Sequence, residues 1–547
     1  MINKVLKVHP NDDMIVALTD LEKGESINFE GNNYILQDVI PAKHKFATKD
    51  FNISESLKMY GVVVGKATQL IKKGGLIHTE NLKHASEDYS IDKKKPYSWT
   101  APENSKFKNR TFMGYHRSDG SIGTANYWLF IPTVFCENRN LEIIKEAFYQ
   151  ELGYAQPDKY KNFTKELATA FIQNEDIETV NFQSNIQHPK SKIFSNIDGI
   201  KFLTHQGGCG GTRQDSEILS KLLAAYADHP NVCGITIMNL GCEHLQAEAL
   251  KKEIFDRNPN FDKPILSFSQ QKGGTEETIV TDAIKQTFIE LIKANNIERK
   301  PAPISKIKMG VKCGGSDGFS GISANPALGY AADLLVACGG TIMMAEFPEL
   351  NGVEQEMVDR SINNDVANKF IHLMRSYSAQ AEAVGSGFYM NPSPGNIKDG
   401  LITDAIKSCG AARKGGFSPV TDVLDYTEKS TKPGLNLVCT PGNDVEATTG
   451  KTASGANVIC FTTGLGTPTG NPICPVIKIA TNDALTQRMP DIIDINTGPI
   501  ISGEKTIPQM GEEILEFVLK VASGEITPKA VQLGQDDFIP WKRGVSL

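Results

Sequence analysis

The feature that most constrains the fold is a repeated order of short apolar runs, glycine-rich loops and helical patterns. Val232–Asn239 is one such run, and it ends in Gly241-Cys242-Glu243. Lys306–Val311 is another; a loop rich in glycine and serine follows it, and then Pro326–Cys338 has helical spacing. This alternation predicts parallel strands joined by helices. Open sheets of that type place ligand sites at the carboxyl ends of their strands, where these loops fall.

The chain has 547 residues, which is too many for one hydrophobic core, and its character changes along its length. Residues 1–88 contain short β-prone segments bounded by turn residues, which predicts a small β-rich domain. Residues 89–108 are polar and contain proline, as a linker does. Two α/β domains are expected to follow, at residues 109–298 and 299–547.

Composition narrows the class of function. Hydrophobic residues make up 40% and charged residues 22%, which is ordinary for a soluble globular protein, and the net charge of -7 argues against a nucleic-acid partner. The sequence contains no apolar run of about 18 residues, so no membrane span is expected. The N-terminal residues lack an apolar signal segment, so we expect a cytoplasmic protein whose cysteines are reduced.

Three loops combine cysteine with glycine directly after a predicted strand: residues 205–213, 241–244 and 312–317. Glycine lets backbone amides approach an anion closely, so these loops predict a shared site made of strand ends. Tight turns with buried thiols are the alternative. Cys209, Cys242 and Cys313 could also hold an iron–sulfur cluster, although their spacing matches no compact motif. None of the loops has a nucleotide-binding pattern.

Other polar residues have the chemistry of a site. His78 and Glu80 are two positions apart, so they would share one face of a strand and suit iron, zinc or manganese. Arg117 precedes a predicted strand and could clamp a carboxylate. Glu346 and Glu349 follow a predicted strand and could act as a base or as metal ligands. For each of these groups, a solvated surface or an acidic helix start is the alternative interpretation.

Several longer segments of the chain have a distinctive sequence: Gly114–Asn126, Asn239–Glu243, Cys313–Pro326, Glu346–Glu349, Lys414–Gly416, Pro441–Asp444 and Thr463–Pro468. These segments resemble the altronate and galactarate dehydratases. Residues 4–88 resemble the SAF domain of that family, and the whole resemblance covers residues 4–88 and 110–500. Residues 150–198 match nothing expected and look like an insertion.

The resemblance implies an α/β catalytic region with an N-terminal SAF domain and the activity of a hydro-lyase. D-altronate would become 2-keto-3-deoxy-D-gluconate and water, with Fe(II) or Mn(II) as the cofactor. Galactarate dehydration, sulfite elimination from sulfolactate and non-catalytic binding of a sugar acid are the alternatives. A homo-oligomer, specifically a dimer, is expected.

The resemblance also implies roles for particular residues. His44, His78, Glu80 and Asp13 are the expected metal ligands, although Glu80 stands where we expect a second histidine. The candidates for proton transfer are His205, Glu243 and Glu349. The candidates for substrate binding are Arg117, Asp119, Arg213, Cys313, Ser316, Asp317 and Asn325.

Overall fold

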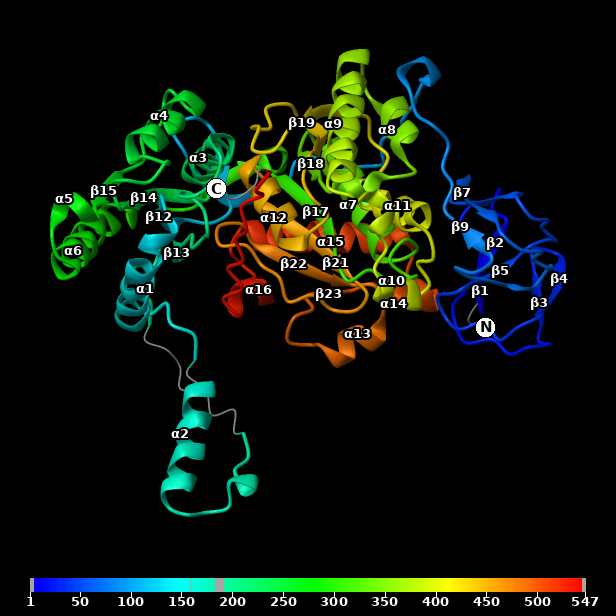
Figure 1. Ribbon diagram of the computed structural model, residues 1–547, viewed down its shortest axis with the longest axis horizontal. Coiled ribbons are helices and arrows are strands. Elements are labelled where there is room, and N and C mark those ends of the chain that lie inside the picture. Colours follow the sequence, from blue (N-terminus) through cyan, green and yellow to red (C-terminus); the bar gives the residue numbers. More distant parts are fainter. Residues whose placement is uncertain (1–3, 158, 183–190, 544–547) are drawn as a thin grey trace.

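The computed structural model describes residues 4–157, 159–182 and 191–543, and Figure 1 shows three regions side by side along the long axis. The N-terminal region lies at one end, the seven-stranded sheet in the middle and the four-stranded sheet at the other end. This arrangement confirms the predicted fold class, a β-rich SAF domain followed by α/β structure.

The N-terminal region consists of short antiparallel strands. Its first sheet has the order β1-β2-β5-β8, a second sheet has the order β6-β7-β9, and β3 pairs with β4 alone. Buried residues of the first sheet and of the β3–β4 pair form a small apolar core of their own, whereas buried residues of β6, β7 and β9 join the main core of the third region. The strands are β1 (Val5–Leu6), β2 (Met14–Ala17), β3 (Ser26–Phe29), β4 (Asn32–Ile35), β5 (Lys45–Ala47), β6 (Ser56–Met59), β7 (Val62–Ala67), β8 (Leu76–Ile77) and β9 (Leu82–Lys83).

The second region has a parallel sheet of order β13-β12-β14-β15. Residues of α3 and α4 pack on one face and residues of α1 and α6 on the other, which explains why the central strands are apolar throughout. The elements are β12 (Tyr127–Pro132), α1 (Asn138–Leu152), β13 (Gly199–Phe202), α3 (Arg213–Asp228), β14 (Val232–Asn239), α4 (Ala247–Arg257), β15 (Ile265–Ser269) and α6 (Glu276–Ala294).

Part of the sequence interpreted as an insertion leaves this region, although Leu152, Phe194 and Ile197 at its two ends belong to the core of the region. In Figure 1 the helix α2 (Lys159–Ile172) projects away from the body of the molecule. Phe171 and Ile172 at its end are 70% and 77% exposed, so the helix contributes little to the core of the second region.

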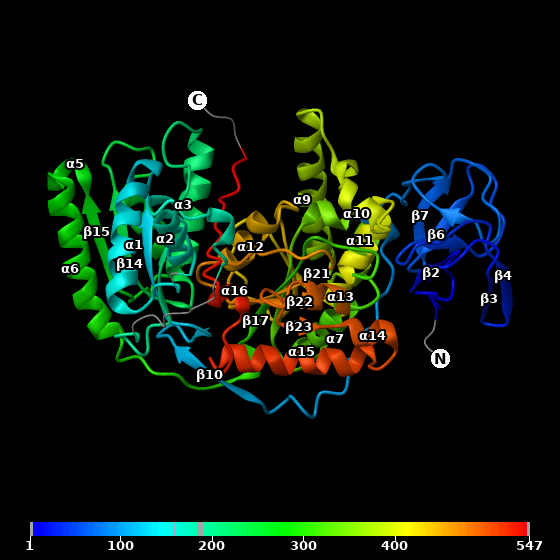
Figure 2. The same ribbon diagram turned by 90° about the horizontal axis from the view of Figure 1, so that it is seen from below.

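The third region has seven parallel strands in the order β19-β20-β18-β17-β21-β22-β23. Helices α7 (Ala324–Ala337) and α15 (Ile507–Ala522) pack together against one face, as Figure 2 shows below the sheet. The helix α12 (Asp444–Ala453) contacts β17. The strands are β17 (Lys308–Cys313), β18 (Thr341–Met344), β19 (Val420–Leu424), β20 (Gly434–Val438), β21 (Val458–Thr463), β22 (Val476–Ala480) and β23 (Ile495–Asn496).

The regions are joined by more than their linkers. A small antiparallel sheet of β10 (Thr111–His116), β11 (Ile122–Gly123) and β16 (Lys300–Pro303) lies where the chain enters and leaves the second region. The C-terminal segment returns between the two sheets, where the backbone N–H of Arg543 donates to Asp215 and that of Trp541 donates to the Tyr426 hydroxyl. Within the described part of the chain, no helix is both long and apolar enough to cross a membrane.

Candidate active site

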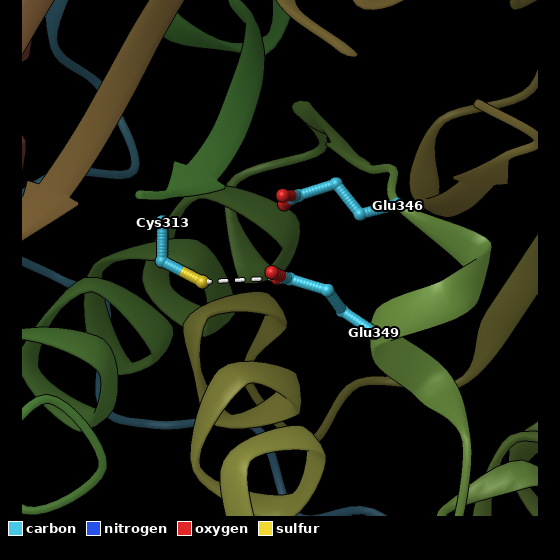
Figure 3. A group of neighbouring side chains, drawn as sticks. All are labelled: Cys313, Glu346 and Glu349. Carbon is cyan, nitrogen blue, oxygen red and sulfur yellow. Dashed lines mark hydrogen bonds between the residues drawn. The ribbon is translucent and has the colours of Figure 1, made fainter. Parts of the chain in front are cut away.

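The carboxyl ends of β17 and β18 bring three metal-ligating side chains together. Cys313 is the last residue of β17, Glu346 follows β18, and Glu349 lies in the short helix η5 (Phe347–Leu350). One ligand atom from each lies within 4.8 Å of the others, and all three residues are buried. Figure 3 shows the two carboxylates and the thiol pointing toward one another, with the Cys313 thiol donating to Glu349 Oε2 at 3.4 Å.

A lysine fills the centre of this group. Lys414 Nζ lies 3.0 Å from the Cys313 sulfur, 3.0 Å from Glu346 Oε2 and 3.6 Å from Glu349 Oε2. Lys414 is itself only 1% exposed, in the turn η7 (Arg413–Gly415). Its ammonium therefore stands where a bound cation would balance the two carboxylates.

Two further lysines complete the charge balance. Lys312 is fully buried, forms an ion pair with Glu346 and lies 2.8 Å from Asp444 Oδ1. Lys407 Nζ lies 3.1 Å from Glu349 Oε1. Because buried charges are strongly unfavourable unless they are paired, these contacts are what allow so many ionisable groups to share one site.

The lysines also set the protonation of the site. Burial alone would raise the pKa of Glu349, but the positive charges of Lys407, Lys414 and Lys312 hold that pKa well below its usual range. Burial raises the pKa of Cys313 to about 11. The site thus presents an ionised carboxylate beside a neutral thiol.

The local backbone is shaped to make this contact. Glu346 is buried yet has φ of 75°, a left-handed conformation that is unfavourable for a residue with a side chain. Such conformations persist where the surrounding structure enforces them, often at functional sites. Gly314 allows Asp444 to approach, because a Cβ at that position would overlap the Asp444 carboxylate.

The predicted substrate residues after β17 lie near this group but are engaged in the fold. Asp317 is fully buried, and its Oδ2 lies 3.1 Å from Lys43 Nζ of the N-terminal domain. Both atoms of the Asn325 amide group are used, since its Nδ2 donates to Gly410 and its Oδ1 accepts from Thr462. Ser316 is 4% exposed, and its carbonyl accepts from an asparagine side chain.

The other predicted proton-transfer residues lie at the second sheet. His205 is buried, its Nε2 is 2.8 Å from the Pro132 carbonyl and its Nδ1 accepts from the Gly207 amide. Burial lowers the pKa of His205, so the ring is neutral. Glu243 is also buried and accepts hydrogen bonds from Thr133 Oγ1 and from the Gly241 amide, each at 2.6 Å.

The predicted arginine clamp is used within the second region. Arg117 Nε donates to the Pro230 carbonyl at 2.8 Å, and its Nη2 donates to the Asn126 side chain at 2.9 Å. Asp119 accepts from the backbone and hydroxyl of Ser121 in an exposed turn. Arg213 is the exposed first residue of α3. The structure therefore does not gather these residues around the buried group.

The predicted metal ligands of the N-terminal domain are also spread apart. Among the residues that the structure describes, His44, His78, Glu80 and Asp13 do not form a group of ligand atoms close enough for one ion. The expectation that His78 and Glu80 share a strand face is wrong, because β8 ends at Ile77 and residues 79–81 form a turn. Their role as metal ligands stays a prediction.

One of those ligands does reach the third region. His44 Nε2 lies 3.1 Å from the Lys398 carbonyl, and the neighbouring Lys45 donates to the Gly400 carbonyl at 2.6 Å. Thr403 in turn donates to the Val64 carbonyl at 3.0 Å. The loop around His44 therefore docks the N-terminal domain beside the segment that follows β17.

Sequence reasoning missed the lysines and Asp444. Lys414 and Asp444 lie within segments that carry the family resemblance, and Lys312 directly precedes Cys313. A signal was therefore present, but lysines are rarely buried, so the pattern gave no reason to place them inside. The three glycine loops belong to two sheets, since Cys313 ends a strand of one sheet and Cys209 and Cys242 follow strands of the other, and a site shared by all three loops stays a prediction.

The strand ends of this parallel sheet bring together carboxylates, a thiol and ammonium groups. Such groups can perform acid–base catalysis on an anionic substrate, as the active site of an enzyme does. Residues 3–85 match the altronate/galactarate dehydratase SAF domain, residues 114–295 the D-galactarate dehydratase/altronate hydrolase second domain, and residues 304–546 the D-galactarate/altronate dehydratase C-terminal domain. The chain belongs to the altronate/galactarate dehydratase family, whose members are hydro-lyases acting on sugar acids.

Individual relatives align over nearly the whole chain. An altronate dehydratase of Bacillus subtilis (strain 168) is 32% identical over 548 residues, 99% of each chain. An altronate dehydratase of Escherichia coli (strain K12) is 30% identical over 95% of this chain and 96% of its own. The galactarate dehydratase (L-threo-forming) of the same strain is 31% identical over 95% of this chain and 93% of its own.

Proposed function

We propose that this protein dehydrates a hexonic sugar acid, with D-altronate converted to 2-keto-3-deoxy-D-gluconate and water. The observation that carries the proposal is the buried group of Glu346, Glu349 and Cys313 with three lysines around it. Altronate and galactarate dehydratases are nearly equally similar to this chain, at 30–32% identity, so the choice of altronate rests on the full-length match.

The residues of the group suit the two halves of a dehydration. The positive charges of Lys312 and Lys407 attract the substrate carboxylate and stabilise the negative charge that develops when the C2 proton leaves. Glu349 is ionised, so its carboxylate takes that proton. The same carboxyl, now protonated, can return a proton to the departing 3-hydroxyl, which leaves as water.

A divalent metal, Fe(II) or Mn(II), is the proposed cofactor. The carboxylates and the thiol suit such an ion in kind, but the Lys414 ammonium lies between them, so it would have to move aside for the ion to bind. Cys313 and Glu346 would hold the ion, which leaves Glu349 free to act as the base. When bound, it would supply Lewis-acid stabilisation of negative charge on the substrate.

Turnover tests the activity and the substrate together. Purified protein, prepared without oxygen, is assayed with D-altronate, galactarate and sulfolactate, each with Fe(II), with Mn(II) and with a chelator. Metal-dependent formation of 2-keto-3-deoxy acid from altronate is the expected result. Turnover of galactarate alone would move the assignment to the diacid, and binding without turnover would identify a sugar-acid binding protein.

Metal content distinguishes the two candidate metal sites. We expect Glu346→Gln to lose most of the bound metal and His78→Ala to keep it, because among the residues that the structure describes only the Glu346 group places three ligand atoms together. The reverse result would instead support the predicted ligands His44, His78, Glu80 and Asp13. Circular dichroism of both variants checks that the fold is retained.

A further inference from the structure

The second sheet carries one cysteine on each of three adjacent loops. Cys136 follows β12, Cys209 follows β13 and Cys242 follows β14. Strand β12 lies between β13 and β14, and all three strands are parallel. Because parallel strands end at the same edge of a sheet and neighbouring strands lie about 4.8 Å apart, the three thiols belong to one strand-end surface.

Backbone hydrogen bonds tie these loops to one another. The Phe135 N–H donates to the Gly207 carbonyl at 3.1 Å, which joins the loop of Cys136 to that of Cys209. The His244 N–H donates to the Gly208 carbonyl at 3.1 Å, which joins the loop of Cys209 to that of Cys242. Each tie lies within two residues of a cysteine.

A side-chain hydrogen bond joins the third pair of loops, those of Cys136 and Cys242. Thr133 Oγ1 donates to Glu243 Oε1 at 2.6 Å, so the loop of Cys136 is also tied to that of Cys242. Gly208 has φ of 96° and packs so closely on Thr133 and Val134 that a Cβ there would overlap their backbone. The convergence of the three loops is therefore built into the fold.

Exposure separates these thiols from the other cysteines. Of the ten cysteines, all of which lie in described parts of the chain, only Cys136, Cys209 and Cys242 are exposed. Six others are buried and Cys338 is half-buried. A cysteine usually packs as a small apolar side chain, so packing does not explain why the three exposed thiols gather on one edge.

The surroundings of the thiols suit a polar ligand. A pocket of about 570 Å³ is lined by Cys209, Asn138 and the loop before α3, and the C-terminal residues 538–542 form its other wall. Asn138 Oδ1 is buried there without a hydrogen-bond partner among the described residues. On the other side, Gln271 Nε2 donates to the Cys242 sulfur at 3.2 Å, as donors near a thiolate do.

A single ion would need the three thiolates closer together than the structure places them. Three thiolates on one tetrahedral ion such as zinc lie about 3.8 Å apart, given a metal–sulfur bond of about 2.3 Å. Among the described residues, the only group of three ligand atoms within 4.8 Å of one another is the one that contains Cys313. An iron–sulfur cluster binds each thiolate to a different iron and so spreads its ligands more widely.

We propose that Cys136, Cys209 and Cys242 bind a [4Fe–4S] cluster. Cys209 lines the 570 Å³ pocket, from which the open iron of such a cluster would take a small oxygen ligand, such as water or the carboxylate of a hydroxy acid. Each thiol loses its proton to the solvent when it binds iron. This site is separate from the carboxylate and lysine group of the other sheet, so it does not rest on the proposed dehydration.

Reconstitution of the full chain tests the proposal. Protein prepared without oxygen is incubated with ferric iron, sulfide and dithiothreitol, which supplies the two electrons that convert four ferric irons to the two ferric and two ferrous irons of the cluster, and is then desalted. We expect about four irons and four acid-labile sulfides per chain, with the electron paramagnetic resonance signal of a reduced cluster after dithionite. The triple variant Cys136→Ser, Cys209→Ser, Cys242→Ser should lose at least nine-tenths of both iron and sulfide.

The matched control is Cys338→Ser, which removes a half-buried thiol of the third region and should keep the full cluster content. The three replaced thiols are exposed, so the triple variant is expected to fold, which its thermal unfolding checks. Iron without sulfide, one zinc ion per chain, or an unchanged cluster in the triple variant would each overturn the proposal. Cluster content is measured without turnover, so the result is independent of the dehydration assay.

Discussion

The two parallel sheets of this protein carry different chemical groups at the carboxyl ends of their strands. At the carboxyl edge of the seven-stranded sheet, two glutamates, a cysteine and three lysines are packed together with almost no exposure. At the carboxyl edge of the four-stranded sheet, three cysteines are exposed, two of them on glycine-containing loops. Topology places side chains at a strand end in both cases, and burial decides which chemistry they can perform.

The difference in burial has a structural cause. The N-terminal domain docks beside the loop after β17, where Lys43 of that domain contacts Asp317 and Asp399. The corresponding edge of the second region is covered only in part, by the C-terminal residues 538–542. Electrostatic interactions between charged groups become stronger when water is excluded. Thiols that are to bind a cluster must instead remain accessible for its assembly.

The carboxyl edges of the two sheets should differ most in their contribution to catalysis. Glu349→Gln removes the ionised carboxylate of the buried group, and we expect kcat/KM for the sugar acid to fall by about 1000-fold, equivalent to about 4 kcal/mol. Glu137→Gln makes the same change to a buried carboxyl of the second region, which accepts from Asn140, and should cost less than about tenfold. Steady-state kinetics of the two variants decides. Equal losses would show that catalysis does not belong to the seven-stranded sheet.

The buried charges should also dominate stability. Lys414→Met leaves Glu346 and Glu349 without their shared partner, so we expect the free energy of unfolding to fall by about 3–5 kcal/mol. Lys432→Met removes an exposed lysine that pairs with Asp422, and should change stability by less than about 0.5 kcal/mol. Urea unfolding of both variants gives the comparison. A Lys414→Met protein as stable as the wild type would show that the ion pairs contribute nothing.

At the carboxyl edge of the four-stranded sheet, close backbone packing holds the loops together, in place of ion pairs. Gly208 and Gly274 have φ of 96° and 97°, so alanine is equally strained at both positions. Only at Gly208 would the added Cβ overlap the Thr133 backbone, since nothing lies within 4 Å of the Gly274 position. Gly208→Ala should therefore cost about 1–3 kcal/mol more than Gly274→Ala. Equal unfolding midpoints would show that the loops are not held together as described.

Much of the framework could be predicted from the sequence. The strand Val232–Asn239 was predicted with the bounds that the structure has, because a strand buried on both faces is a largely apolar run. The resemblance to the dehydratase family was confirmed by the matched domains. Local patterns carry this information because each strand and helix buries its own apolar face.

The composition of the candidate site could be predicted only in part. Glu349 and Cys313 were predicted, because both follow a strand within a recognisable segment. Lys414 and Lys312 were not, since a lysine inside the protein is stable only beside carboxylates that come from distant parts of the chain. The distribution of the cysteines between two sheets was also hidden, because strand order is set by packing and not by spacing along the chain.

The smallest expected effect concerns the contact that makes the two edges differ. Lys43 Nζ lies 3.1 Å from Asp317 Oδ2 and 2.9 Å from Asp399 Oδ1, and its side chain is 20% exposed. Lys43→Met keeps most of the apolar contact of the side chain but removes both ion pairs, so we expect a loss of about 1 kcal/mol, since partly exposed pairs are screened by water. Lys72→Met, which removes a well-exposed pair with Asp50 in the same domain, is the matched control.

If docking of this domain keeps water from the buried group, Lys43→Met should also increase hydrogen exchange at residues 313–318, and Lys72→Met should not. Unchanged exchange in the Lys43 variant would mean that the burial of the seven-stranded edge comes from its own loops and not from the N-terminal domain.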